Sequence, residues 1–340
     1  MYRFLSGIKV VEIAGLAPVP HCGMMLADFG ADVTVIDKKN PAIEQRLNRG
    51  KTMKQLDLKN PEDIKKVRDL CQTSDVLLDP YRPGTLEKMG LDPSTLWNNN
   101  KGLIICKISG YGQTGRMSQE TGHDINYVAL SGMLPTFSGV NATRPWPPAN
   151  MLADFAGGGL SAAFGILSAI YARSHNGGKG CLLDCSMTEG VAYLSSFVQH
   201  YYDQPNLFTD KYALFSGECP IYRTYKTKDD KFVAVGAVEP KFYQNLFKLL
   251  NVDGRDLFVN PGKITEDLES RFLQKTRDKW ANIFKGQECC VTPVLDIHEV
   301  GSYGQHVDRN SFTKTSSNWI ANPSPRVWTQ DELAALSSKK

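Results

Sequence analysis

The first two hundred residues alternate short, continuous apolar runs with longer stretches in which apolar positions recur every three or four residues. Short apolar runs bounded by turn residues are typical of buried strands, whereas the longer spacing is typical of amphipathic helices. Strands are predicted at residues 9–13, 32–36, 75–78, 103–106 and 181–185. Helices are predicted at residues 20–29, 61–71 and 160–173. This alternation favours a doubly wound, Rossmann-like α/β domain with a parallel sheet.

The pattern changes after residue 203. Apolar runs at 220–225 and 231–235 flank a polar turn, which predicts a β-hairpin. Helical patterns follow at 240–250 and 266–284. These elements are typical of a smaller α+β domain.

We therefore expect two domains. A large α/β domain comprises residues 1–203 and is joined by the C-terminal segment 311–340. A small α+β domain comprises residues 204–310, and a long helical stretch at 186–202 leads into it. No internal repeat or low-complexity segment interrupts this division.

Composition and charge narrow the classes of partner. The hydrophobic fraction of 41% and the charged fraction of 22% are ordinary for a globular protein. The net charge of +3 comes from dispersed lysines and arginines, so we expect no nucleic-acid partner. No apolar run approaches the roughly 18–20 residues that span a bilayer, so we expect no membrane span. The eight cysteines contain no C-x-x-C pair, which predicts reduced core residues of an intracellular protein rather than a disulfide or zinc framework.

The first strand–helix–strand unit raises the question of a nucleotide site. The segment 15–20 has one glycine and two prolines, so it lacks the glycine-rich turn that binds a dinucleotide pyrophosphate. A nicotinamide or flavin site is therefore not expected. Five basic residues follow the second strand within fourteen positions, and either form a solvated face or hold a phosphorylated ligand. They are Lys38, Lys39, Arg46, Arg49 and Lys51.

Two polar segments carry candidate chemistry. His123 lies in Gly122-His-Asp-Ile-Asn-Tyr127, and a helix that begins just after Gly122 would place its imidazole at the positive helix end, which favours a neutral general base. A structural histidine is the alternative. Asp154 precedes three glycines and an apolar helix, so it is either a helix cap or a catalytic acid or nucleophile. In the second case the glycines leave room for a ligand, and their N–H groups stabilise an oxyanion.

With these motifs the chain resembles the α-methylacyl-CoA racemases of the type III CoA-transferase superfamily. The resemblance covers roughly residues 5 to 310 and includes the segments 49–51, 122–127, 152–159, 184–190 and 235–240. It implies an interlaced homodimer whose active sites lie between the large domain of one subunit and the small domain of the other. It also implies an acyl-CoA thioester as substrate, no separate cofactor, and a location in peroxisomes, mitochondria or both.

The resemblance assigns residues to roles. His123 and Asp154 would be the acid/base pair on opposite faces of the 2-methyl-bearing carbon, and Glu239 a supporting carboxylate. Lys38 replaces a common arginine, and a lysine lacks the bidentate fork for phosphate. The CoA contacts would fall on Lys38, Arg49, Lys51, Leu58, Arg82, Gly122, Asp124, Ile125, Asn126 and Tyr127.

The expected reaction is a 1,1-proton transfer that interconverts R and S epimers through an enolate, in the metabolism of branched fatty acids or sterol side chains. One group removes the α-proton while the other delivers a proton to the opposite face. N–H groups near Asp154 would stabilise the enolate oxygen. Asp154 must be protonated in part of the cycle, which requires a raised pKa.

Two other readings remain open. A type III CoA-transferase would use Asp154 as a nucleophile that forms an acyl-enzyme anhydride, and would need no base at position 123. A non-enzymatic CoA-binding protein is the third class. After residue 310 the family's Gly-x-His-Thr segment is not found, and residues 328–336 are expected to form a short helix in its place.

Overall fold

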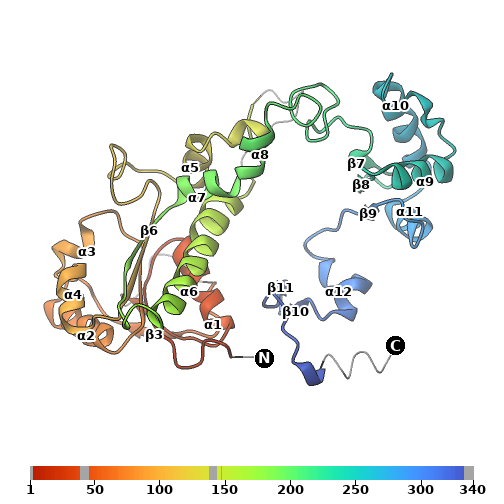
Figure 1. Ribbon diagram of the computed structural model, residues 1–340. Helices are drawn as coiled ribbons and strands as arrows, with labels where there is room; N and C mark the ends of the chain where they lie inside the picture. The colour runs from red at the N-terminus through yellow and green to blue at the C-terminus, as the bar shows by residue number, and fades with distance from the viewer. Residues whose placement is uncertain (1–2, 39–45, 138–143, 147, 333–340) are drawn as a thin grey trace. The chain divides into compact units, whose positions relative to one another are not determined.

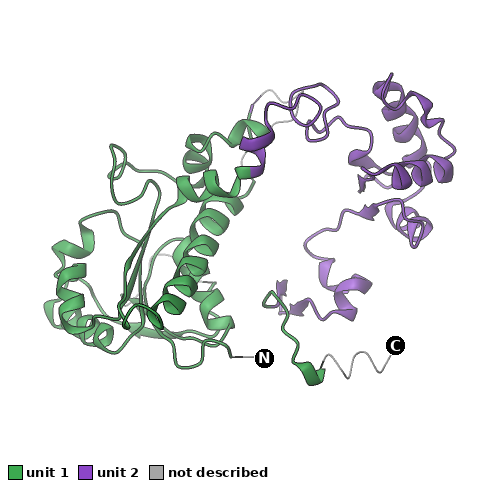
Figure 2. Cartoon of the chain, viewed as in Figure 1, with its two compact units in different colours: residues 1–137, 145–196, 323–340 green, residues 138–144, 197–322 purple. Residues whose placement is uncertain are grey.

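The computed structural model describes residues 3–38, 46–137, 144–146 and 148–332. The chain divides into two compact units (Figure 2). The large unit comprises residues 1–137, 145–196 and 323–340, and the small unit comprises residues 138–144 and 197–322. The first boundary therefore falls at 196 rather than at 203, because Phe197 packs against Phe208 and Phe215 of the small unit. The second boundary falls at 322 rather than at 310.

The large unit is built on a six-stranded sheet with the order β3-β2-β1-β4-β5-β6, in which every neighbouring pair is parallel. This confirms the doubly wound α/β class. Because the order reverses between β1 and β4, the carboxyl ends of these strands form a topological switch point. The strands are β1 (Lys9–Ile13), β2 (Asp32–Asp37), β3 (Thr52–Gln55), β4 (Val76–Asp79), β5 (Ile104–Ser109) and β6 (Leu182–Ser186).

Five of the predicted strands are present, and β3 was missed. Its four residues, Thr52 to Gln55, are all exposed at the edge of the sheet, so they carry no apolar run. The central strands are almost fully buried on both faces, as parallel strands covered by helices are. Hydrophobic burial therefore signals the centre of this sheet but not its edge.

Helices cover both faces of the sheet (Figure 1). On one face Val11, Leu77 and Ile105 pack against α2 (Pro61–Gln72), α3 (Thr85–Lys88) and α4 (Pro93–Asn99). On the other face lie α1 (Pro18–Asp28) and α6 (Ser161–Arg173). Alternate side chains of each strand point to opposite faces, which assigns Val10 and Glu12 of β1 to the α1 side.

The remaining elements of the large unit follow β5 and β6. They are α5 (Asp124–Leu130), the 3₁₀ helix η1 (Leu134–Phe137), the π-helix η2 (Met151–Leu160) and α7 (Met187–Leu194). The long helix predicted over 186–202 is instead two helices, α7 and α8 (Ser196–Tyr201). The break falls at Ser195, between the end of α7 and the start of α8, where the hydroxyl and the backbone N–H both donate to the Val191 carbonyl.

One helical stretch, Met151–Arg173, is long and apolar enough to cross a membrane by length and composition alone. The expectation that no stretch reaches this length is therefore wrong, because η2 and α6 run on as one apolar helix. Core helices pass the same test, and this stretch packs against α1, α7 and β5. It is weak evidence for a membrane span.

The small unit contains the predicted hairpin, formed by β7 (Tyr222–Lys226) and β8 (Phe232–Gly236), with β9 (Val291–Pro293) as a third antiparallel strand. The helix α9 (Pro240–Leu250) has the predicted bounds. The single helix predicted over 266–284 is two helices, α10 (Pro261–Phe272) and α11 (Arg277–Phe284). The other elements are η3 (Gly254–Asp256), η4 (Val300–Ser302), α12 (Gly304–Asp308), β10 (Phe312–Lys314) and β11 (Trp319–Ala321).

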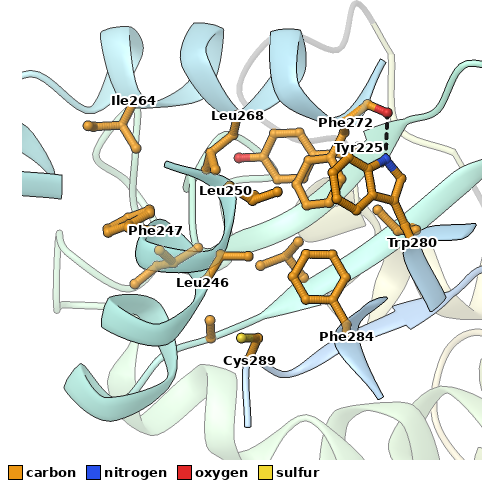
Figure 3. Close-up of a cluster of buried hydrophobic side chains, with 14 of the residues drawn as sticks. Tyr225, Leu246, Phe247, Leu250, Ile264, Leu268, Phe272, Trp280, Phe284 and Cys289 are labelled. Carbon is orange, nitrogen blue, oxygen red and sulfur yellow. Dashed lines mark hydrogen bonds between the residues drawn. The ribbon is translucent and has the colours of Figure 1, made fainter. Parts of the chain in front are cut away.

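An aromatic core holds the small unit together (Figure 3). Tyr225 of β7 stacks on Phe272 of α10 with ring centroids 4.9 Å apart. The Trp280 indole N–H donates to the Phe272 carbonyl at 2.8 Å, which satisfies a polar atom inside the core. The fold of this unit therefore has a hydrophobic core of its own.

Candidate active site

A cavity of about 610 Å³ opens in the large unit where β1, β4 and β5 end. Leu16 follows β1, Pro80 follows β4, and Ser109 ends β5, so the cavity occupies the switch point of the sheet. His123 and Asp154 both line it. The other lining residues are Pro18, Val19, Arg82, Ile108, Gly110, Tyr111, Ser118, Glu120, Thr121, Gly122, Asn126, Tyr127 and Met187.

His123 is the residue that precedes the first turn of α5, as predicted. Its backbone N–H donates to the Asn126 side-chain oxygen at 3.0 Å, which fixes the entry to the helix. The Tyr127 hydroxyl donates to the Gly122 carbonyl, and the Tyr127 ring packs where side chains at Gly110 and Gly122 would otherwise lie. These contacts hold the backbone on both sides of the histidine, while the histidine itself remains exposed.

Asp154 lies in the first turn of the π-helix η2 and is only 9% exposed. Its side chain does not cap the helix, so the alternative that Asp154 is a helix cap is wrong. Burial and, to a lesser extent, the nearby Asp124 carboxylate raise the pKa of the Asp154 carboxyl to about 6, and His123 opposes the shift. The carboxyl is therefore able to exist in both protonation states near neutral pH.

Asp124 connects these two residues. It follows His123 in the chain, and its Oδ2 accepts hydrogen bonds from the backbone N–H groups of Ala153 at 2.8 Å and Asp154 at 2.9 Å. Its side chain is fully buried. Asp124 is not among the residues that line the cavity, and the expectation that it contacts CoA stays a prediction.

The three glycines after Asp154 pack against other elements instead of a ligand. A Cβ at Gly157 would lie 2.8 Å from the Val191 backbone nitrogen, and one at Gly159 would lie 2.9 Å from the Pro18 carbonyl oxygen. Gly157, Gly158 and Gly159 are all buried. The glycines therefore allow α7 and α1 to approach the π-helix. None of the three glycines is among the residues that line the cavity, and the N–H groups of Ala153 and Asp154 donate to Asp124, so the oxyanion site expected at the glycines stays a prediction.

The expected CoA contacts divide into two groups. Arg82, Gly122, Asn126 and Tyr127 line the cavity, whereas Lys38, Arg49, Lys51, Leu58 and Ile125 are not among its lining residues.

Three residues of the second group have other surroundings. Arg49 forms a bidentate ion pair with Asp28 at 2.6 and 2.8 Å. Lys51 is fully buried against Glu12. Leu58 packs against the hydrophobic core beside α2. Of the basic cluster, Lys39 lies outside the described residues.

Arg82 lines the cavity from a loop that is held by several hydrogen bonds and an ion pair. Its guanidinium donates to the Gln119 carbonyl at 2.8 Å, and the Gln119 amide donates to the Pro83 carbonyl at 3.0 Å. At the base of the loop, Asp79 accepts from the Tyr81 N–H and pairs with Lys107 at 3.6 Å. The sequence analysis did not predict these contacts, although Asp79, an aspartate at the end of a buried strand, indicated that such a contact exists.

Glu239 lies in the small unit, directly before the first residue of α9. All residues that line the cavity belong to the large unit. Within the described part of the chain, no group of three or more metal-binding side chains is found. The helix expected over 328–336 extends beyond the described residues, so its full length is not described.

Comparisons with known proteins identify the family to which the chain is similar. CoA-transferase family III matches residues 5–335. Alpha-methylacyl-CoA racemase of Homo sapiens is 42% identical over 354 residues, which cover 99% of this chain and 89% of the human protein. The Mus musculus racemase is 41% identical with the same coverage. Succinyl-CoA:glutarate CoA-transferase of Homo sapiens is 25% identical and covers 87% of this chain and 73% of that protein.

Solved structures agree on the fold. Rv3272 from Mycobacterium tuberculosis has a TM-score of 0.79 and 22% identity, and the match covers 96% of this chain and 94% of that one. A CAIB/BAIF family protein from Brucella suis has a TM-score of 0.76 and 21% identity, with full coverage of both chains. At these identities the similarity concerns the fold alone.

Proposed function

Because the chain belongs to CoA-transferase family III, we propose that it is an α-methylacyl-CoA racemase, which interconverts the R and S epimers of 2-methylacyl-CoA thioesters. One observation carries the proposal: His123 and Asp154 line a single cavity, and the pKa of Asp154 is raised to about 6. An imidazole beside a carboxyl whose pKa is raised to about 6 is suited to exchange a proton with a carbon acid. The identity of 41–42% with two racemases supports the same reaction.

The proposed reaction is a proton exchange at one carbon. In one direction the neutral imidazole of His123 takes the α-proton, and the protonated carboxyl of Asp154 delivers a proton to the opposite face. In the other direction the carboxylate takes the proton and the imidazolium returns one. The intermediate is an enolate of the thioester, and the cavity must stabilise its oxygen as charge develops. No redox cofactor is needed, since no electrons leave the substrate.

The cavity suits an acyl-CoA ligand by its composition. Leu16 and Met187 provide apolar surface for an acyl chain, and Arg82 provides a positive charge for a phosphate of CoA. Within the proposed substrate class, both branched fatty-acyl chains and sterol side chains satisfy this description.

A homodimer is part of the proposal. On α6 the side chains of Phe164, Leu167 and Tyr171 are 71%, 44% and 72% exposed, and they continue a stripe that starts at Leu160. An apolar stripe of this size is typical of a surface that another protein covers. A second copy of the chain would cover it, and Glu239 of the partner subunit would complete each cavity.

The test uses one epimer of a 2-methylacyl-CoA in deuterated water. We expect α-deuterium incorporation together with approach to both epimers, and loss of both in His123→Ala and Asp154→Ala. Asp92→Asn is the matched control, because Asp92 caps α4 and does not line the cavity. Transfer of CoA to an added carboxylate, without α-exchange, would instead identify a CoA-transferase with Asp154 as nucleophile.

A further inference from the structure

We propose that Asp124 is a positioning residue that couples the two acid/base groups. It directly follows His123 in the chain, and its carboxylate accepts hydrogen bonds from the backbone N–H groups of Ala153 and Asp154. The inference rests on the proposed function. It assigns to Asp124 a role in proton transfer that the expected role as a CoA contact does not include.

The first argument is geometric. A single oxygen, Oδ2 of Asp124, accepts from the N–H groups of Ala153 and Asp154 at 2.8 and 2.9 Å. These N–H groups belong to the first turn of the π-helix, where no intrahelical acceptor exists for them. Because Asp124 also begins α5, any displacement of its carboxylate moves Asp154 relative to His123.

The second argument concerns burial. Asp124 is fully buried, and its Oδ1 has no hydrogen-bond partner among the described residues. A buried carboxylate oxygen without a partner is costly, and a neutral asparagine would accept the same two N–H groups. A buried negative charge on Asp124 that lowers stability indicates a functional role for that charge.

The third argument identifies the group on which that charge acts. The Asp124 carboxylate raises the pKa of Asp154, and His123 lowers it. Among the described residues, the charges that act on the pKa of Asp154 are those of Asp124 and His123. His21 of α1 lies edge-on to Phe155, and Glu189 of α7 is exposed. Tyr127 of α5 keeps its hydroxyl proton, because its own pKa is raised to about 12.

The consequence is a shared proton. Because the pKa of Asp154 is raised to about 6, its carboxyl can hold or release a proton near neutral pH, and the imidazole of His123 is the other group of the pair that can accept that proton. Each of the two states is the starting state for one direction of the reaction. Removal of the Asp124 charge would favour the state with the proton on histidine.

The primary test does not depend on turnover. The side-chain carboxyl carbons of aspartate are labelled with ¹³C, the Asp154 signal is assigned from its loss in Asp154→Asn, and its titration is followed in the wild type and in Asp124→Asn. We expect the pKa of Asp154 to fall by about one unit at most in the variant, because a like charge is removed while the larger effect of burial remains. The control Asp92→Asn leaves the Asp154 titration unchanged.

A measurement on the unmodified protein covers the case in which Asp124→Asn fails to fold. The amide protons of Ala153 and Asp154 should be protected from exchange with solvent if they donate to Asp124. Rapid exchange at both amides would overturn the proposal. An Asp154 titration in Asp124→Asn that superimposes on the wild type would also overturn it.

Kinetics then separate this inference from the proposed function. If the wild type exchanges the α-proton, Asp124→Asn should lower kcat/KM at pH 7 by up to about tenfold, because one pKa unit is a tenfold change in the protonated fraction of Asp154. The acid limb of the pH profile should move to lower pH. Weaker binding of free CoA with an unchanged pH profile would make Asp124 a CoA contact. A wild type without exchange contradicts the racemase, while the Asp154 titration still decides the role of Asp124.

Discussion

The carboxylate of Glu12 and the ammonium of Lys51 lie 2.7 Å apart, and neither side chain has any exposed surface. Lys51 also donates to the Pro20 carbonyl at 2.8 Å, so the pair ties β1 to α1 and to the segment before β3. A Cβ at Gly23 would lie 1.8 Å from a Glu12 oxygen, which leaves glycine as the residue that fits. Burial raises the pKa of Glu12 to about 7 and lowers that of Lys51. This pair supports the loop that leads into the cavity.

Removal of one partner should be costly. Lys51→Met leaves the Glu12 carboxylate buried without a counter-charge, and we expect the free energy of unfolding to fall by about 3–5 kcal/mol. The loss should be larger at pH 8 than at pH 5, because a buried carboxyl with a raised pKa takes up a proton as the pH falls and the destabilising charge disappears. Urea denaturation at the two pH values measures both effects.

The matched control is Lys66→Met, which removes the partner of Asp63 on the exposed surface of α2. It should change stability by less than about 1 kcal/mol. The double variant Glu12→Leu with Lys51→Met should recover most of the loss, because no unpaired charge remains. Equal effects of Lys51→Met and Lys66→Met would contradict the importance of the buried pair.

Asp154→Asn should abolish α-exchange and stabilise the fold. The carboxyl has a pKa of about 6 in the folded protein against an ordinary value of 3.8, so the folded state is progressively destabilised as the pH rises through this window. We expect the variant to gain about 1–3 kcal/mol of unfolding free energy at pH 7. The gain should vanish below pH 4, where the wild-type carboxyl is protonated in both states. A loss of stability at pH 7 would argue against the raised pKa.

The close approach of α7 to the π-helix should not tolerate a methyl group. A Cβ at Gly190 would lie 2.1 Å from the Gly157 carbonyl oxygen, which belongs to the backbone and cannot move aside as a flexible side chain can. Gly190→Ala should therefore cost about 3 kcal/mol or more, measured by thermal unfolding, and should reduce α-exchange by displacing Asp154. Gly165→Ala on α6 is the control. There the nearest atom lies at an ordinary 3.5 Å, and alanine should be neutral or mildly stabilising.

The apolar stripe on α6 should control assembly. Phe164→Glu together with Tyr171→Glu places charges on the two most exposed aromatic residues of this helix, and we expect the homodimer to dissociate to monomers in sedimentation velocity. The control Ser168→Glu changes a residue whose hydroxyl only bonds its own helix. A double variant that sediments like the wild type would show that another surface forms the dimer.

Mixing of two inactive variants tests whether the sites are shared between subunits. Asp154→Ala and Glu239→Ala are each expected to lose α-exchange when pure. If Glu239 acts in the cavity of the other subunit, reassembled mixtures should regain about a quarter of the wild-type activity, since half the dimers are mixed and each has one intact site. Absence of any recovery, in mixtures shown to contain mixed dimers, would place both residues in the same subunit's site.

The sheet and its helices were largely predictable, because buried parallel strands and amphipathic helices leave clear hydrophobic patterns. The strand at Thr52–Gln55 was not, since an exposed edge strand with polar residues resembles a loop. The break at Ser195 was missed because the apolar pattern runs through it.

The candidate site was predicted in its residue types but not in its contacts. His123 and Asp154 stood out as polar residues beside glycines, and both line the cavity. The partners of Arg49 and Lys51, however, are Asp28 and Glu12, which precede them by 21 and 39 residues. No local pattern reveals such long-range ion pairs. For this reason a basic cluster that suggested a phosphate site proved to contain two residues with internal partners.

The π-helix at Met151–Leu160 also limits which sequence changes this segment can accept during evolution. A π-helix has a wider turn than an α-helix and differs from it in the number of residues per turn. Loss or gain of one residue here would rotate every later side chain by about 100° around the axis, as in any helix of ordinary pitch. Exposed positions such as Met151 and Leu160 can be exchanged without this effect. The segment is therefore free to vary in the identity of several residues but not in their number, and insertions or deletions should be rarer in it than substitutions.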